Sequence, residues 1–375
     1  MAFDAEDIRW MHSALSLSKR GLGRVWPNPA VGCIIVRDGV VRGRGVTAAG
    51  GRPHAEAAAL QQAGPAAKGA TAYVTLEPCA RPGRDQSCAD KLIAAGVSRV
   101  VAAITDPNPQ VNGQGLAKLQ AAGIVSECGL LEDAARDIHA GFFARVTRNR
   151  PLVALKLATS LDGKIATASG ESRWITGEAA HRAVHLLRSQ HDAVMTGIGT
   201  VLADNPMLDV RDLGITAHPV RLVLDTQLRL PPASRLVQSA RARPLWVIHA
   251  PAADGPAVQV LADLGVTTIV CPTGPDGRLN LKQALVLLAE RGLTRVLCEG
   301  GAALAAALIT GNFADRLVTF SAGKIIGAEG LSAVGAIALH DLALAPAFRL
   351  VRSEIFGAEV MTVWQRRSAA RPELP

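Results

Sequence analysis

The feature that most constrains the fold is a repeated alternation of short apolar runs with amphipathic runs that have helical spacing. Residues 30–45 predict two strands joined at Asp38-Gly39, a dipeptide typical of tight hairpins. Helical patterns over 54–64 and 88–97 then alternate with apolar runs, of which 70–79 is the first. This alternation predicts an α/β sandwich around a partly parallel sheet.

A polar, basic stretch over residues 144–151 predicts a linker between this series and a second one. The second series has further strand-like runs, among them 192–206, and closes with a predicted antiparallel hairpin across Gly357. Because domains commonly span about 150 residues, a chain of 375 residues suggests two of them. We expect one domain over 1–147 and another over 150–369. Helices in the second are predicted over 178–189, 280–292 and 302–310.

Composition narrows the possible partners and the compartment. The net charge of +8 favours acidic partners, and without a Lys/Arg block a small phosphate-bearing substrate fits at least as well as nucleic acid. Aromatic residues at 3% leave little for stacking on nucleic acid. No apolar run approaches the roughly 20 residues that cross a bilayer, and the start lacks the apolar region of a signal peptide. Six irregularly spaced cysteines do not form a disulfide framework. We therefore expect a cytoplasmic protein whose thiols are metal ligands or buried fillers.

Four residues have the spacing of a catalytic zinc site. His54 and Glu56 open a helical pattern, Cys79 follows a strand and Pro78, and Cys88 opens the next helical pattern. One histidine and two thiolates leave a fourth zinc position open, as in catalytic sites. Glu56 is then a proton carrier beside a water that zinc activates. The alternative without a functional role is that His54 and Glu56 are solvent-exposed residues on the first turn of a helix.

The spacing of His54 and Glu56 indicates where they must lie. Residues two apart on a regular helix point about 200° from each other. Their side chains converge only at a helix end, and Pro53 before them suits a helix start. The pattern His-x-Glu, then Pro-Cys and a second Cys, is the zinc deaminase signature. Its usual form has fewer residues between the cysteines than separate Cys79 and Cys88, so a loop must bring this pair together.

A second, weaker pattern lies near the end of the chain. A predicted strand ends at Glu299, two glycines follow, and an alanine-rich helix begins. Such a turn lets a diphosphate approach the N–H groups at a helix start. Strand–Gly-Gly–helix turns are also common structural features, and the G-x-G-x-x-G fingerprint is absent.

Several longer motifs together resemble the bifunctional riboflavin-biosynthesis family, in which a pyrimidine deaminase is fused to a reductase. The resemblance spans roughly residues 5–365 and implies a cytidine-deaminase-like three-layer α/β/α domain followed by a dihydrofolate-reductase-like α/β domain. The motifs are "PNPAVGCIIV" (27–36), "PHAEAAAL" (53–60), "GATAYVTLEPC" (69–79), "DPNPQVNGQG" (106–115), "LKLATSLDGKIAT" (155–167) and "GIGTVLADNPMLDVR" (197–211).

The resemblance implies cofactors and site residues. Zinc would be bound by His54, Cys79 and Cys88, with Glu56 as the catalytic residue. NADPH would lie against Ala158, Trp174, Thr200, Asp204, Thr226 and the turn Gly301, Ala302, Ala303, Leu304, Ala305, Ala306 and Ala307. Substrate would contact Asn28, Lys156, Ser172, Arg188, Leu208, Arg211 and Glu299. Guanidinium groups at 188 and 211 could hold a phosphate.

The implied function is two successive steps on a phosphorylated pyrimidine. The first hydrolyses the 2-amino group of a ribosylated diaminopyrimidinone phosphate, and the second reduces the ribosyl group to ribityl with NADPH. A homodimer is expected, with neither nucleic acid nor membrane as a partner. Two alternatives stay open. One is a reductase whose deaminase half has decayed, because Arg81 and Pro82 stand where the family usually has histidines. The other is a zinc deaminase that acts on nucleic acid.

Overall fold

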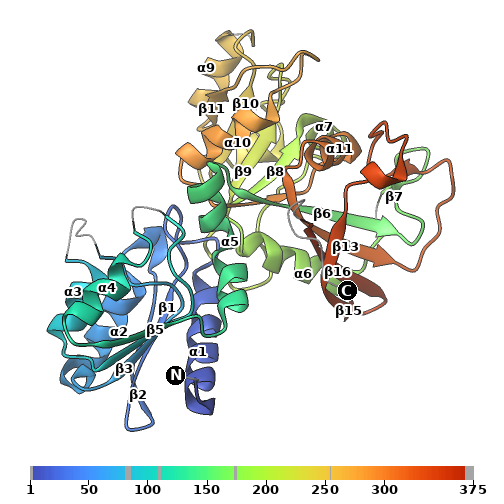
Figure 1. Cartoon of the computed structure of the whole chain (residues 1–375). Coiled ribbons are helices and arrows are strands. Elements are labelled where there is room, and N and C mark those ends of the chain that lie inside the picture. Colours follow the sequence, from blue (N-terminus) through green and yellow to red (C-terminus); the bar gives the residue numbers. More distant parts are fainter. Residues whose placement is uncertain (1–2, 81–85, 109–110, 173–174, 254, 368–375) are drawn as a thin grey trace. The chain divides into compact units, whose positions relative to one another are not determined.

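The computed structural model describes residues 3–80, 86–108, 111–172, 175–253 and 255–367. Contacts within the chain divide it into two compact units (Figure 1). The first comprises Met1–Pro151 with Ala289–Thr294, and the second comprises Leu152–Leu288 with Arg295–Pro375. Each unit has its own sheet. Within the described ranges, no helix is both long and apolar enough to cross a membrane.

The first unit is built on a mixed sheet with the strand order β2-β1-β3-β4-β5. β1 is antiparallel to both of its neighbours, whereas β3, β4 and β5 run parallel. The predicted hairpin is confirmed, since Asp38 and Gly39 between β1 and β2 both have positive φ angles, 55° and 69°. The strands are β1 Gly32–Arg37, β2 Val40–Val46, β3 Thr71–Val74, β4 Arg99–Ala102 and β5 Val125–Cys128.

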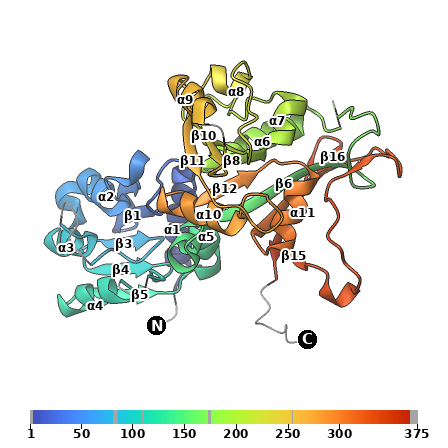
Figure 2. The ribbon, with the colours of Figure 1, turned by 90° about the horizontal axis from the view of Figure 1, so that it is seen from above.

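Helices cover both faces of this sheet (Figure 2). α2, α3 and α4 pack in series on one face, and α1 and α5 pack together on the other. The α-helices are α1 Ala5–Ser18, α2 Ala55–Ala63, α3 Cys88–Ala94, α4 Gln114–Ala121 and α5 Glu132–Arg148. Short 3-10 helices span Lys19–Gly21, Ala49–Gly51 and Gly64–Ala67. The result is the layered α/β architecture expected from the alternating patterns.

A close contact between α2 and β2 fixes where α2 begins. A Cβ at Gly45 would lie 1.9 Å from Ala55 O, so only glycine lets the first turn of α2 lie against this strand. The core beneath is aliphatic, with Ile35, Val74 and Leu92 fully buried or nearly so. The start of α2, where His54 lies, is therefore held rigidly against the sheet.

The second unit has a nine-stranded sheet with the order β11-β10-β9-β8-β12-β6-β13-β16-β15. The strands from β11 to β13 run parallel, and β16 and β15 extend the sheet as an antiparallel hairpin. The strands are β6 Leu152–Ser160, β8 Ala193–Gly197, β9 Val220–Leu224, β10 Leu245–His249, β11 Thr267–Val270, β12 Arg295–Cys298, β13 Ala314–Ala322, β15 Phe348–Phe356 and β16 Glu359–Arg366. β7 Lys164–Ala166 and β14 Leu331–Ser332 form a separate pair.

The strand order brings distant segments together at the carboxyl edge of this sheet. β12 lies between β8 and β6, so chain segments that follow these strands become neighbours. Open α/β sheets bind ligands at such an edge. The accompanying helices are α6 Glu178–Ser189, α7 Ile198–Asp204, α8 Arg235–Gln238, α9 Gly255–Asp263, α10 Leu281–Glu290, α11 Ala302–Thr310 and the 3-10 helix Leu342–Leu344.

Two expectations about local structure were wrong. The basic stretch 144–151 is not a linker along most of its length, because α5 continues to Arg148. Arginines in the last turn of a helix interact favourably with its dipole, so a basic stretch can also indicate a helix end. The run 192–206 is not all strand, since β8 ends at Gly197 and α7 follows directly.

Candidate functional site

The start of α2 presents His54 and Glu56 toward the same point. His54 is the N-cap residue, with an extended backbone (φ −70°, ψ 159°), and Glu56 lies in the first turn. The helix end thus supplies the convergence that a regular helix would not allow at this spacing. Glu56 is 3% exposed, so its carboxyl group lies inside the unit.

Backbone hydrogen bonds bring the two cysteines together despite their separation in the sequence. Ser87 caps α3 by accepting from Asp90 N–H, which makes Cys88 the first helical residue. The N–H of Cys88 donates to Cys79 Sγ at 3.2 Å, and the N–H of Ala89 donates to Cys79 O at 3.1 Å. Two donors at the start of a helix therefore hold Cys79, and the one that reaches Sγ favours its thiolate form.

His54, Cys79 and Cys88 form a compact set of potential metal ligands. His54 Nδ1 lies 3.2 Å from Cys88 Sγ and 3.8 Å from Cys79 Sγ. One ligand atom from each residue lies within 4.8 Å of the others. An imidazole and two thiols at these distances fit a tetrahedral zinc ion, whose fourth position would stay open. The structure brings together the three ligands that the sequence predicted.

The electrostatics of this set favour metal binding. A hydrogen bond from the Cys88 thiol, with a further contribution from His54, lowers the pKa of Cys79 to about 4. The same hydrogen bond and burial raise the pKa of Cys88. The hydrogen bond with Cys79 likewise raises the pKa of His54. The two thiols thus share one proton, which a bound cation would displace.

Glu56 lies beside the ligands without belonging to the set. Burial raises the pKa of its carboxyl group, and a hydrogen bond to Cys88 opposes this effect. A carboxyl group whose pKa is moved toward neutrality can both take up and release a proton. Glu56 therefore meets the requirement for a proton carrier at this site.

Glu77 is a site residue that the sequence interpretation did not assign. Its buried carboxylate accepts hydrogen bonds from the N–H groups of Asp106, Gly113 and Gly115 at 3.1, 2.9 and 2.8 Å. It thereby anchors the 106–115 loop beside the Pro78-Cys79 segment. The sequence feature that could have indicated Glu77 is its position, an acidic residue shortly after a predicted strand and two places before a predicted metal ligand.

The predicted pyrimidine-binding residue Asn28 is fixed by its own side chain. Its Nδ2 donates to Gly51 O at 2.8 Å. Gly51 has a φ of +89°, and a Cβ there would lie 2.1 Å from Asn28 Nδ2. Within the described part of the chain, Asn28 Oδ1 has no hydrogen-bond partner, so this oxygen is available as an acceptor. Arg81 and Pro82 lie outside the described residues.

In the second unit, Glu299 forms the centre of a buried charge cluster. It follows β12 and accepts two hydrogen bonds from Arg188, Nε to Oε1 at 2.6 Å and Nη2 to Oε2 at 3.0 Å. Lys156 Nζ lies 4.0 Å from Oε2. Burial opposes ionisation of Glu299, but these two cations lower its pKa to about 2. The structure thus brings together three of the predicted substrate residues.

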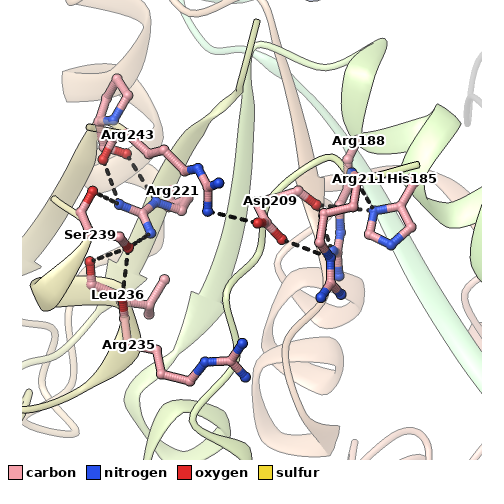
Figure 3. Close-up of polar contacts among 10 residues, drawn as sticks. His185, Arg188, Asp209, Arg211, Arg221, Arg235, Leu236, Ser239 and Arg243 are labelled. Atoms are coloured by element: carbon pink, nitrogen blue, oxygen red, sulfur yellow. Dashed lines mark hydrogen bonds and ion pairs between the residues drawn. The ribbon is translucent and has the colours of Figure 1, made fainter. Parts of the chain in front are cut away.

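Arg211, another predicted substrate residue, contacts a buried residue that was not assigned, Asp209 (Figure 3). Asp209 is 2% exposed, and its Oδ1 lies 3.3 Å from Arg211 Nε. Its carbonyl oxygen accepts from Arg188 Nη1 at 2.9 Å and lies 3.1 Å from His185 Nδ1. A single aspartate therefore links both arginines. Its only signal in the sequence is an acidic residue two places before Arg211.

Part of the predicted NADPH set, Thr200 and the turn 301–307, lies at the start of α11. Gly301 is the N-cap and no side chain caps this end, so the first N–H groups are open to a diphosphate. A Cβ at Gly301 would lie 3.6 Å from Thr200 Oγ1, which places these two residues side by side. Ala305 and Ala306 face the core instead. These features fit a dinucleotide that approaches through the first turn of α11.

The other predicted residues lie on several elements of the second unit. Ala158 lies in β6, Thr226 follows β9, Asp204 is the exposed last residue of α7, and Leu208 is buried with a φ of +52°. Ser172 is half-buried in the loop after β7. Trp174 lies outside the described residues.

Comparison with known proteins accounts for both units. The model described as "Cytidine and deoxycytidylate deaminase zinc-binding region" matches residues 4–104, and "RibD C-terminal domain" matches residues 151–362. Riboflavin biosynthesis protein RibD of Escherichia coli (strain K12) is 40% identical over 367 residues, which cover 95% of this chain and 98% of that protein. The chain belongs to the RibD family.

Solved structures extend the RibD likeness to the fold. Acinetobacter baumannii RibD, form 1, superposes with a TM-score of 0.86 and 39% identity, covering 97% of this chain and 99% of that chain. The Thermotoga maritima diaminohydroxyphosphoribosylaminopyrimidine deaminase/5-amino-6-(5-phosphoribosylamino)uracil reductase gives a TM-score of 0.83 and 34% identity, with 96% and 99% coverage. The predicted family and fold class are confirmed. As a RibD protein, the chain is a bifunctional deaminase and reductase of riboflavin biosynthesis, with zinc and NADPH as cofactors.

Proposed function

We propose that residues 1–147 form the deaminase domain and residues 150–369 the reductase domain, and that both act on one phosphorylated pyrimidine. The first removes the 2-amino group of a ribosylated diaminopyrimidinone phosphate by hydrolysis. The second reduces its ribosyl group to ribityl. The convergence of His54, Cys79 and Cys88 with Glu56 beside them is the observation that carries the proposal.

In the deaminase step, the proposed roles follow from position. His54, Cys79 and Cys88 would hold a zinc ion, which would supply a Lewis acid for the water molecule that attacks the pyrimidine. Glu56 takes a proton from that water and delivers it to the departing ammonia, since it is buried beside the ligands and not one of them. Asn28 Oδ1 accepts a hydrogen bond from the pyrimidine, and the loop anchored by Glu77 borders the pocket.

In the reductase step, the buried cluster around Glu299 positions the sugar and supplies a proton. NADPH, when bound, supplies the hydride that reduces C1′ of the ribose. Opening of the sugar requires a proton on the ring oxygen, and Lys156 is the proposed donor. Burial lowers the pKa of Lys156, with Glu299 opposing this effect, so its ammonium group can release a proton more readily. Glu299 also accepts a hydrogen bond from a ribose hydroxyl.

A single assay tests the proposal. The purified chain is given the diaminopyrimidine phosphate with NADPH, and ammonia release and NADPH absorbance are followed with and without a zinc chelator. We expect both signals, with ammonia appearing first and the chelator abolishing it. NADPH consumption on the deaminated substrate without any ammonia release from the diamino compound would instead identify a reductase with a decayed deaminase half.

We also propose that the chain is a cytoplasmic homodimer that pairs through β15. This strand is the edge of the nine-stranded sheet, and Leu350, Val351 and Ile355 on it are 47%, 50% and 80% exposed. Antiparallel pairing of two copies about Ser353 would place Arg352 of one opposite Glu354 of the other. Ile355→Lys is expected to shift the mass measured by light scattering from dimer to monomer. An unchanged mass would exclude this edge as the interface.

A further inference from the structure

We propose that Arg243, together with Arg211, binds the phosphate group of the reductase substrate, and that Asp209 is the residue that positions both. The assignment rests on the proposed reductase function. It changes the sequence expectation, in which Arg188 was the second phosphate ligand. The side-on fork of Arg188 is already occupied, since its Nε and Nη2 both donate to Glu299.

The side chain of Arg243 is held by the same carboxylate as that of Arg211. Asp209 Oδ2 accepts from Arg243 Nη1 at 2.8 Å, and Oδ1 lies 3.3 Å from Arg211 Nε (Figure 3). The carboxylate is 2% exposed, whereas the side chains of Arg243 and Arg211 are 29% and 53% exposed. Two guanidinium groups, one on each side of this carboxylate, are thus anchored by one buried residue while their side chains stay partly exposed.

The backbone of Arg243 is fixed as well, by the fully buried Arg221 in β9. The guanidinium of Arg221 donates to the carbonyl oxygens of Arg243 and Ser239 and to Ser239 Oγ, the last at 2.7 Å (Figure 3). An arginine fixed at both its backbone and its side chain loses little conformational entropy when it binds a ligand. This preorganisation distinguishes Arg243 from an ordinary surface arginine.

The anchored pair retains unused donors and excess positive charge. Within the described ranges, the Nη atoms of Arg211 and the Nε and Nη2 of Arg243 have no hydrogen-bond partner. One carboxylate balances only one of these two cations, and a third, the buried Arg221, contacts the backbone of Arg243. Guanidinium donors in excess over local acids suit a phosphate, which accepts forked hydrogen bonds.

The experiment measures the reductase reaction of Arg243→Gln on the deaminated substrate, with and without its phosphate group. We expect KM for the phosphorylated substrate to rise roughly 10- to 100-fold, because hydrogen bonds to a charged group are lost. Neither kcat nor KM for the dephosphorylated substrate should change more than about twofold. A change of that size is too small to indicate a lost contact with the substrate. Arg278→Gln, which changes an exposed arginine of the same unit, serves as the matched control.

Two further measurements separate phosphate binding from a purely structural ion pair. Arg243→Lys keeps the charge beside Asp209 but loses the fork, so we expect an intermediate KM and weaker competitive inhibition by inorganic phosphate than in the unmodified chain. The kcat of each variant for the dephosphorylated substrate should stay within about twofold of the unmodified value, which reports folding of the second unit, where Arg243 lies. Asp209→Asn should raise KM for the phosphorylated substrate only.

The outcomes that overturn the assignment are distinct. Equal rises in KM for the two substrates in Arg243→Gln, or no rise for either, would make the Asp209–Arg243 pair structural. If inorganic phosphate inhibits Arg243→Lys as strongly as the unmodified chain, the Asp209–Arg243 pair is likewise structural. This test holds even if Arg243→Gln fails to fold. An unmodified chain that oxidises no NADPH on the deaminated substrate would overturn the proposed reductase function, and this assignment with it.

Discussion

At the scale of single residues, different local structures position the three predicted metal ligands, His54, Cys79 and Cys88. His54 is placed by the start of α2, Cys88 by the start of α3, and Cys79 by the N–H groups of Cys88 and Ala89. Cys79 therefore depends on two donors that belong to its neighbour's helix. Its thiol has the pKa that is lowered, to about 4, so it is the ligand that is most readily deprotonated.

Replacing Cys79 should remove zinc. In Cys79→Ser, a hydroxyl with a much higher pKa takes the place of the thiolate, and two protein ligands remain. We expect stoichiometric zinc to fall to a small fraction of that in the unmodified chain, measured by metal analysis after dialysis. Cys128→Ser, a half-buried cysteine of β5 outside the ligand set, should keep its zinc. Full zinc content in Cys79→Ser would refute the ligand assignment.

Replacing Glu56 should stop deamination and spare the metal. Glu56→Gln keeps the size of the side chain but cannot take up a proton, and general acid–base catalysis contributes roughly 10²- to 10⁴-fold. We expect ammonia release to fall by a factor in this range, while zinc content and reduction of the deaminated substrate persist. Glu6→Gln, on the exposed face of α1, is the control. A variant with normal ammonia release would exclude Glu56 as the proton carrier.

At the scale of elements, the loop between β4 and α4 is held to the metal site by backbone groups. Glu77 accepts from Asp106, Gly113 and Gly115, and a Cβ at Gly115 would lie 1.9 Å from Pro78 O. The two ends of this loop are therefore held by Glu77, and the start of α4 packs against Pro78. Substrate affinity of the deaminase should depend on this contact even though Glu77 does not face the metal.

Glu77→Gln tests the loop contact. An amide offers one acceptor oxygen in place of two, so at least one buried N–H would lose its partner at a cost of about 1–3 kcal/mol. We expect a lower melting temperature and a several-fold higher KM for ammonia release, with zinc retained. Loss of zinc at unchanged KM in the residual holoenzyme would show that Glu77 acts on Cys79 and not on the loop.

Local sequence patterns predicted most helices and strands. They did not predict the contacts between distant residues that complete the two sites. The hairpin at Asp38-Gly39 and the convergence of His54 with the cysteines follow from turn chemistry and helix geometry. The ends of α5 and β8 did not, because basic residues suit both a linker and a helix end, and an apolar run suits both helix and strand. The contacts of Glu77 with its loop, and those of Asp209 with Arg188 and Arg243, join residues 21–38 positions apart, a distance at which periodicity carries no information.

At the scale of the whole molecule, buried histidines make stability depend on pH. His191 is 5% exposed, its Nδ1 lies 2.7 Å from Leu187 O, and burial together with Arg295 lowers its pKa to about 3. The unfolded chain, with an ordinary histidine pKa of about 6.5, binds this proton first as pH falls. The contribution of His191 to stability is therefore complete above that value and is lost progressively between pH 6.5 and 3.

This linkage predicts a measurable slope. Below about pH 6.5, His191 should lower the free energy of unfolding by up to ~1.4 kcal/mol per pH unit. We expect the urea midpoint of the unmodified chain to fall between pH 7 and pH 4.5 more steeply than that of His191→Gln. His12→Gln, which changes an exposed histidine on α1 of the other unit, serves as the matched control. Parallel slopes in the unmodified chain and His191→Gln would show that His191 is not buried in the neutral form.

The separate sheets and cores of the two units lead to a prediction about the complete reaction. All residues proposed for deamination lie in the first unit, and all those proposed for reduction lie in the second. A chain that lacks one activity should therefore be complemented by a chain that lacks the other.

We expect Cys79→Ser to release no ammonia and Lys156→Met to oxidise no NADPH. Mixed in equal amounts with the diaminopyrimidine phosphate, they should oxidise NADPH after a lag in which the deaminated intermediate accumulates in solution. Ammonia release without NADPH oxidation in the mixture, although Cys79→Ser alone reduces added intermediate, would show that the intermediate must pass between two intact sites of one chain.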